Sequence, residues 1–139
     1  MKFQGKIYKE GRFWLAEIQF LELMTQGYTK KETLLMVEDL FKTLANKENF
    51  EVNVRSDKIG NIEIGSNDTK TMICILLQRR RQISGLSLSQ VAQKLGFSSK
   101  NSYARYEQGR SVPSVEKLNT ILNALSSETD FIITQSQLH

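Results

Sequence analysis

Residues 86–110 are LSLSQVAQKLGFSSKNSYARYEQGR, a stretch that predicts two short helices joined by a tight turn. Ser87 is placed to cap the first helix, because a serine hydroxyl accepts a hydrogen bond from a free backbone N–H at a helix start. Gly96 supplies the turn, since glycine adopts positive φ without steric cost. Ser98 or Ser99 then caps the second helix. The stretch therefore has the layout of a helix-turn-helix, whose second helix enters the major groove of DNA.

The second helix of this stretch has two chemically different faces. Tyr103 and Tyr106 are three residues apart and are expected to face inward. We expect the polar and cationic residues of the outer face to contact DNA: Lys100, Asn101, Ser102, Arg105, Gln108 and Arg110. Asparagine pairs geometrically with adenine, and arginine or lysine with guanine. The alternative for any one of these side chains is an ordinary solvated surface group.

The same segment resembles the Cro/XRE class of phage-repressor-like domains, over residues 68–126. The resemblance rests on the lead-in LLQRRRQISGLSLSQVA, on YEQGR at the end of the second helix, and on Pro113-Ser114 before the next helix. It implies an ion pair buried between the first and third helices of the domain, formed here by Arg81 and Glu107. One departure is an additional residue between the turn and Glu107, which changes the first turn of the second helix.

Composition and charge limit the classes of function. The chain has 139 residues, enough for one domain or two small ones, and its one cysteine forbids an internal disulfide. No apolar run is long enough to cross a membrane, and the first residues lack a signal peptide, so we expect a cytoplasmic protein. Residues 1–66 contain ten basic and ten acidic residues, whereas residues 67–139 contain nine and five. The excess positive charge therefore coincides with the helix-turn-helix, as expected for a protein that binds a phosphate backbone.

The N-terminal half predicts a small α+β domain of order βββαβ with one additional strand. Strands are expected over residues 2–8, 13–20 and 24–28, then 50–55 and 62–64, with a helix over 30–46. Thr29 and Glu32 form the capping box that begins this helix. Phe50, Val52 and Val54 alternate with polar residues and give the clearest strand pattern.

This half resembles the HicB antitoxins, whose N-terminal domain has a partial ribonuclease-H-like fold. The matching residues are the strand FWLAEIQF, the lead-in TQGYTKKET and the helix TLLMVEDLFKTLA. The resemblance implies a type II antitoxin. Its N-terminal domain would block a small HicA-like mRNA interferase, and its C-terminal domain would bind the operon's own promoter and repress it.

Two other classes of function remain open. A stand-alone XRE-family regulator, whose N-terminal domain senses a ligand or dimerises, shares every argument on the DNA side. An enzyme is disfavoured, because the one histidine is the terminal His139 and no paired catalytic groups or phosphate loop are present. We therefore expect no catalytic residue, metal or cofactor.

The last residues predict a dimerisation element. Phe131, Ile132 and Ile133 are apolar and β-prone, and the helical domain offers them no strand partner. Pairing with a second copy would form a homodimer and set the spacing of two recognition helices. The alternative is that they fold back as apolar cover on their own helices. The expected domains are thus 1–66 for toxin binding, 67–128 for DNA binding and 129–139 as a strand or tail.

Overall fold

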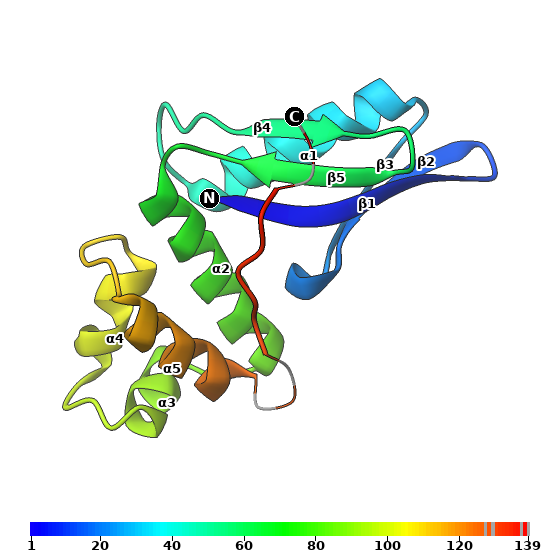
Figure 1. Ribbon diagram of the computed structural model, residues 1–139. Coiled ribbons are helices and arrows are strands. Elements are labelled where there is room, and N and C mark those ends of the chain that lie inside the picture. The colour runs from blue at the N-terminus through cyan, green and yellow to red at the C-terminus, as the bar shows by residue number, and fades with distance from the viewer. Residues whose placement is uncertain (127, 129, 137, 139) are drawn as a thin grey trace. The chain divides into compact units, whose positions relative to one another are not determined.

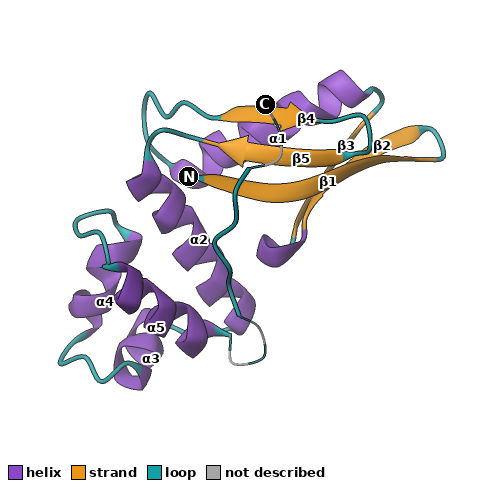
Figure 2. Ribbon diagram, viewed as in Figure 1, coloured by secondary structure: helices purple, strands orange, loops and turns teal. Residues whose placement is uncertain are grey.

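The computed structural model describes residues 1–126, 128, 130–136 and 138, which form two compact units (Figure 1). Residues 1–69, with the described part of 135–139, make a sheet unit. Residues 70–134 make a helical unit. The mixture of strands and helices is the α+β composition that the sequence predicts (Figure 2).

The sheet unit is a five-stranded antiparallel sheet with strand order β3-β2-β1-β5-β4. Its strands are β1 (Lys2–Glu10), β2 (Phe13–Ile18), β3 (Leu23–Gly27), β4 (Asn53–Ser56) and β5 (Asn61–Gly65). The first strand lies in the middle of the sheet, between β2 and β5. The sheet is therefore complete only when segments far apart in the sequence have paired.

Helix α1 (Lys30–Ala45) packs on one face of this sheet and forms its core. Phe3 and Ile7 of β1 alternate with polar residues and are buried, and the ring of Phe3 lies 6.1 Å from that of Phe41. Val37 and Phe41 of α1 are fully buried. The opposite side of the sheet, here called the open face, has the intervening polar residues of β1.

Capping interactions set the ends of α1 where the sequence predicts them. The Thr29 hydroxyl accepts a hydrogen bond from the backbone N–H of Glu32 at 3.0 Å. The Glu32 carboxylate accepts from the N–H of Tyr28 at 3.1 Å. Asn46 ends the helix in a left-handed conformation with φ of 46°. Asparagine tolerates this conformation better than most residues.

Two strand predictions need correction. The pattern Phe50–Val54 predicts a strand from residue 50, but β4 begins at Asn53, which pairs with Gly65 at the end of β5. The preceding residues have no partner strand to pair with. The second predicted strand continues to Phe20, whereas β2 ends at Ile18 and a 3₁₀ turn, η1 (Gln19–Leu21), follows.

The helical unit contains four helices in its described part. They are α2 (Thr69–Ser84), α3 (Leu88–Lys94), α4 (Lys100–Glu107) and α5 (Val115–Leu125). Its buried apolar side chains come from every helix, and those exposed by less than 2 % include Leu77, Val91, Tyr103 and Ile121. Val115 belongs to the apolar stripe of α5 but is 72 % exposed, because it occupies the first position of that helix. Among the described residues, no helix has the length and apolar character to cross a bilayer.

Within the single chain, residues 130–136 have neither helical nor strand structure. The strand predicted at Phe131–Ile133 would pair with a second copy, so it stays a prediction. The ring of Phe131 lies 5.5 Å from the guanidinium of Arg80 on α2. Ile132 and Ile133 are 83 % and 93 % exposed.

Candidate nucleic-acid interface

The start of α3 is fixed by a reciprocal capping box. The Ser87 hydroxyl accepts from the N–H of Gln90 at 3.1 Å, and the side-chain oxygen of Gln90 accepts from the N–H of Ser87 at 2.8 Å. Both donors would otherwise lack partners at the helix start. This local arrangement needs no contact from distant residues, which explains why the sequence reveals it.

The turn between α3 and α4 depends on Gly96, which has φ of 74°. The N–H of Phe97 closes the turn on the carbonyl of Ala92 at 2.9 Å, a bond typical of a helix that ends at glycine. Of the two serines that the sequence offers as the next cap, Ser99 occupies the cap position. Its hydroxyl lies 3.2 Å from that of Ser102 and makes no side-chain capping bond.

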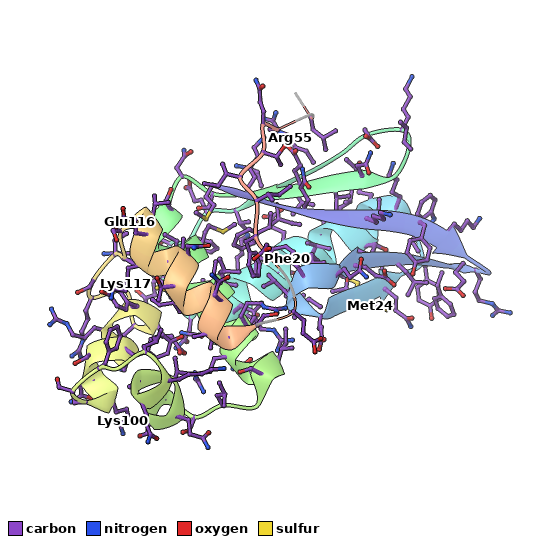
Figure 3. The ribbon with its side chains drawn as sticks, turned by 60° about the horizontal axis from the view of Figure 1, so that its bottom comes forward. Phe20, Met24, Arg55, Lys100, Glu116 and Lys117 are labelled. Carbon is purple, nitrogen blue, oxygen red and sulfur yellow. The ribbon has the colours of Figure 1, made fainter. Side chains whose placement is uncertain are left out.

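Helix α4 divides into a buried face and an exposed one. Tyr103 is fully buried, and Tyr106 is half-buried with its ring 6.5 Å from that of Phe97. The predicted contact residues are exposed, apart from the half-buried Ser102: Lys100, Asn101, Arg105, Gln108 and Arg110. Figure 3 labels Lys100 at the surface, at the beginning of α4. Five of the six predicted residues are thus accessible within α4 or just after it.

The positive charge of this exposed face is not balanced within α4. Lys100 and Arg105 both point outward, whereas the acid of the helix, Glu107, is 5 % exposed and engaged in an ion pair. Arg110 lies three residues beyond the end of α4, and its N–H donates to the carbonyl of Arg105 at 2.9 Å, which fixes the backbone there. A cationic surface next to amide groups can bind phosphates and base edges at the same time.

Arg81 and Glu107 form a bidentate ion pair that positions α4. Arg81 Nε lies 2.7 Å from Glu107 Oε2, and Nη2 lies 3.0 Å from Oε1. Arg81 Nη1 also donates to the carbonyl of Leu86 at 3.1 Å, just before α3. The hydrogen bond with Glu107 raises the pKa of Arg81 above its ordinary value. One side chain at the end of α2 therefore holds both helices of the motif.

Gln78 and the buried Tyr103 also support this arrangement. Gln78 Nε2 donates to the backbone carbonyl of Glu107 at 2.9 Å. Burial, and then the negative charge of Glu107, raise the pKa of Tyr103, so this phenol stays neutral. Gln78 and Tyr103 therefore help to hold α4 in place.

The structure adds polar residues that the sequence analysis missed. A shallow hollow between α3 and α4 is lined by Lys100 and by four other polar residues, Ser89, Gln93, Ser98 and Ser99, together with Ala92, Gly96 and Phe97. The spacing of Ser89 and Gln93, four residues apart on a short helix, is the signal that could have identified them. They extend the polar surface of α4 onto α3.

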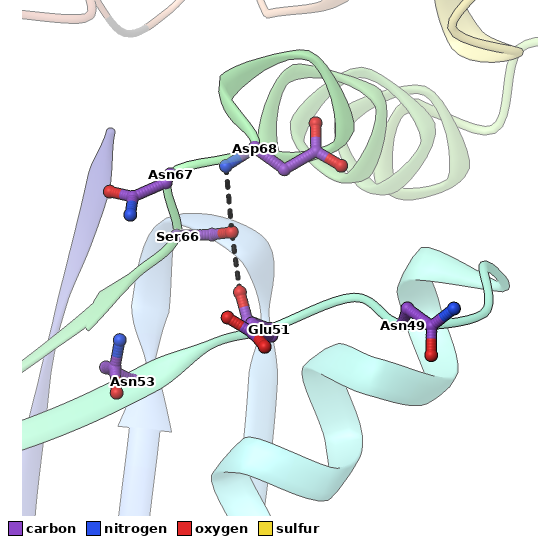
Figure 4. Close-up of a pocket in the computed structure, with 6 residues that line it drawn as sticks. All are labelled: Asn49, Glu51, Asn53, Ser66, Asn67 and Asp68. Carbon is purple, nitrogen blue, oxygen red and sulfur yellow. Dashed lines mark hydrogen bonds between the residues drawn. The ribbon is translucent and has the colours of Figure 1, made fainter.

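A second hollow, in the sheet unit, has a structural role. Its polar lining is Asn49, Glu51, Asn53, Ser66, Asn67 and Asp68 (Figure 4). The Ser66 hydroxyl donates to the carbonyl of Glu51 at 2.6 Å and accepts from the N–H of Asp68 at 3.1 Å. Asp68 in turn pairs with Lys47 at 2.6 Å. These groups hold the end of β5 and the beginning of α2.

Comparison with known proteins agrees with this geometry. Residues 75–129 match the model of a family described as a helix-turn-helix domain. The matched residues begin within α2 and include α3, the turn, α4 and α5. No curated protein matches the chain. The helical unit therefore contains a helix-turn-helix domain.

Proposed function

We propose that the chain is a DNA-binding transcription regulator that places α4 in the major groove. The observation that supports this most strongly is the exposed face of α4, where Asn101 and Arg105 lie one helical turn apart beside Lys100. In this proposal Asn101 contacts adenine, and Arg105 contacts guanine through two hydrogen bonds. Ser102 and Gln108 make further polar contacts, and Arg110 binds a phosphate.

A binding experiment with the DNA upstream of the chain's own gene tests this proposal. Fluorescence anisotropy should give much tighter binding to one site in that DNA than to random DNA of equal length. Affinity for both DNAs should fall steeply with salt, because bound phosphates release counterions. Equal affinity for every sequence would contradict a sequence-specific regulator.

We further propose that the regulator is a HicB-type antitoxin that represses its own operon. In this proposal the sheet unit has the partial ribonuclease-H-like fold of that family and binds a HicA-like ribonuclease. The chain itself has no catalytic role and acts in the cytoplasm. Support comes from the strand and helix order of residues 1–66, followed by the helix-turn-helix domain.

The surface of the sheet unit also favours a protein partner. Its exposed apolar side chains include Met24 at 56 %, Tyr28 at 68 % and Leu35 at 52 % exposed. The rings of Tyr28 and Phe13 lie 5.4 Å apart at a tilt of 39°, so the exposed tyrosine has an aromatic neighbour. Exposed apolar side chains can take part in a protein interface, and Met24, Tyr28 and Leu35 are candidates on the sheet unit.

Expression with the toxin-like protein encoded beside the gene tests the antitoxin proposal. Full-length chain should restore growth, and so should the Arg105→Ala variant, because neutralisation is assigned to the sheet unit. Tyr28→Asp should weaken rescue, while the exposed Lys31→Asp should not. A chain that binds its operator but fails to rescue growth or to co-purify with the toxin would favour the stand-alone XRE-family regulator.

We also propose a homodimer formed through Phe131, Ile132 and Ile133. The exposure of the two isoleucines supports this proposal. Replacing Ile132 and Ile133 with aspartate should give a folded monomer by sedimentation equilibrium, with weaker binding to a palindromic operator. A dimer of unchanged mass in the double variant would place the dimer interface elsewhere.

A further inference from the structure

Glu63 of β5 is buried on a part of the sheet where its neighbours are exposed. The register places Gln4 of β1 and Arg55 of β4 directly beside it, and both are exposed. Glu63 itself is only 4 % exposed. Its side chain lies on the open face, since Ile62 and Ile64 on either side point into the core. Something other than the strands must therefore cover this carboxylate.

Residues 135, 136 and 138, here called the return segment, belong to the same compact unit as Glu63. The Ser136 hydroxyl donates to Glu63 Oε1 at 2.5 Å, across 73 positions of sequence. Lys2 Nζ lies 3.3 Å from both Glu63 Oε1 and Ser136 Oγ. The three side chains make one hydrogen-bonded cluster at the start of β1.

The chemistry of this cluster suits an uncharged peptide. A buried carboxylate is costly unless hydrogen-bond donors surround it, and a hydroxyl that donates to an anion makes one of the stronger hydrogen bonds in proteins. Lys2 supplies the opposite charge. Residues 131–138, FIITQSQL, contain no charged side chain, so the segment brings a donor without adding a second charge to bury.

We propose that the open face around Glu63 is a peptide-binding site that the chain's own return segment occupies. Its ligand is an extended, uncharged segment with a hydroxyl donor at the position of Ser136. Any protein that binds this part of the face must displace the segment. The inference does not depend on the antitoxin proposal, because the ligand is part of the same chain.

Nuclear magnetic resonance of the full chain with matched substitutions tests this site. Ser136→Asp places a carboxylate against Glu63 and should expel the segment, whereas Thr134→Asp adds the same charge at an exposed position two residues earlier. Ser136→Asp should shift the amide signals of Lys2 and Glu63. It should also speed amide exchange at Glu63 about tenfold, as expected for loss of a hydrogen bond to a charged group. Ser136→Ala should act in the same direction, and Thr134→Asp should leave both signals in place.

Two results would overturn the assignment. The first is an amide signal of Glu63 that shifts equally in Thr134→Asp and Ser136→Asp, while the amide signals of the other strands stay in place. The second is binding between chains. To detect it, a Cys74→Ala, Gln135→Cys chain carrying a nitroxide at position 135 is mixed with isotope-labelled chain that has no nitroxide. Broadening of the Lys2 signal of the labelled chain would show that the segment binds a different copy. Broadening only within the same chain supports the proposal.

Discussion

The helical unit and the sheet unit are stabilised by different kinds of interaction. In the helical unit, the bidentate pair of Arg81 and Glu107 joins three segments of chain at a nearly buried position. In the sheet unit, the centre between α1 and the strands is apolar, and polar groups act mainly at turns and at the open face. In the helical unit a nearly buried ion pair therefore orients helices that an apolar core already brings together. The stability of the sheet unit can be followed separately by Trp14 fluorescence, because Trp14 lies in β2 and is the one tryptophan of the chain.

Glu107→Gln is expected to have the largest effect, and only on the helical unit. Removing the carboxylate charge leaves the Arg81 guanidinium unpaired at a position that water reaches poorly. This lowers the free energy of unfolding by about 3–5 kcal/mol. The helical transition measured by circular dichroism should move down by more than about 10 °C. Trp14 fluorescence should report an unchanged transition for the sheet unit. The matched control is Glu116→Gln, an exposed acid in the first turn of α5, and equal transitions for the two variants would contradict the role given to the pair.

Gly60→Ala is expected to destabilise the sheet unit alone. Gly60 has φ of 108°, and an added Cβ would lie 2.6 Å from the carbonyl oxygen of Ile7 in the central strand. We expect a loss of about 3 kcal/mol, at the upper end of the cost of backbone strain. Denaturant unfolding followed by Trp14 fluorescence measures it. Gly11→Ala, which has φ of 61° and open space around it, should cost clearly less, and a reversed order would refute the steric explanation.

Arg105→Ala should change DNA binding without changing the stability of either unit. Loss of a base contact is expected to weaken binding to the specific site by about 1–3 kcal/mol and binding to random DNA much less. Arg12→Ala removes the same charge from the sheet unit and serves as the control in the anisotropy assay. If Arg105→Ala weakened binding to both DNAs equally, Arg105 would contact only the phosphate backbone.

The smallest expected effect is a pH dependence at the turn before β5. Asp57 Oδ1 accepts hydrogen bonds from the N–H groups of Ile59, Gly60 and Asn61, and Oδ2 accepts from the Asn61 side chain. The side-chain bond from Asn61, followed by its backbone bond, lowers the pKa of Asp57 from its ordinary value of 3.8.

This lowered pKa fixes the sign of the pH dependence. The stabilisation from the Asp57 carboxylate is present above the ordinary pKa and is lost as the pH falls through the lowered value. Asp57→Asn should therefore reduce the stability of the sheet unit more at pH 6 than at pH 2. Unfolding curves from Trp14 fluorescence at the two pH values measure the difference, with Asp39→Asn of α1 as the control. An equal loss at both values would show that the charge of Asp57 does not matter.

Local interactions account for what the sequence could predict. The capping box of Ser87 and Gln90 and the left-handed turn at Gly96 involve residues only a few positions apart. The same holds for Thr29 and Glu32 at the start of α1. Because each interaction is complete within one or two helical turns, the residue types alone predict the motif and the exposed face of its second helix.

Long-range interactions account for the features that the sequence could not predict. The alternation at Phe50–Val54 is present, but the strand begins at Asn53 because its partner β5 ends at Gly65. Likewise, nothing in the sequence near Glu63 indicates that Ser136 binds it. In the candidate site, the contribution of α3 through Ser89 and Gln93 depends on how two helices pack across the turn. The four-residue spacing of Ser89 and Gln93 indicates that they share one face of α3, but it does not indicate that this face lies beside α4.

The central place of β1 has a consequence during synthesis of the chain. Its first neighbour, β2, follows at once, but its second neighbour, β5, ends only at Gly65. Ribosomes add about 5–20 residues per second. For a few seconds, therefore, the side of β1 that later pairs with β5 has no partner strand in the nascent β1–β2 hairpin. An unpaired edge is a template for strands of other chains. The interval before β5 emerges is thus when a growing polypeptide is most exposed to aggregation on the polysome, and slow translation of residues 30–65 would lengthen it.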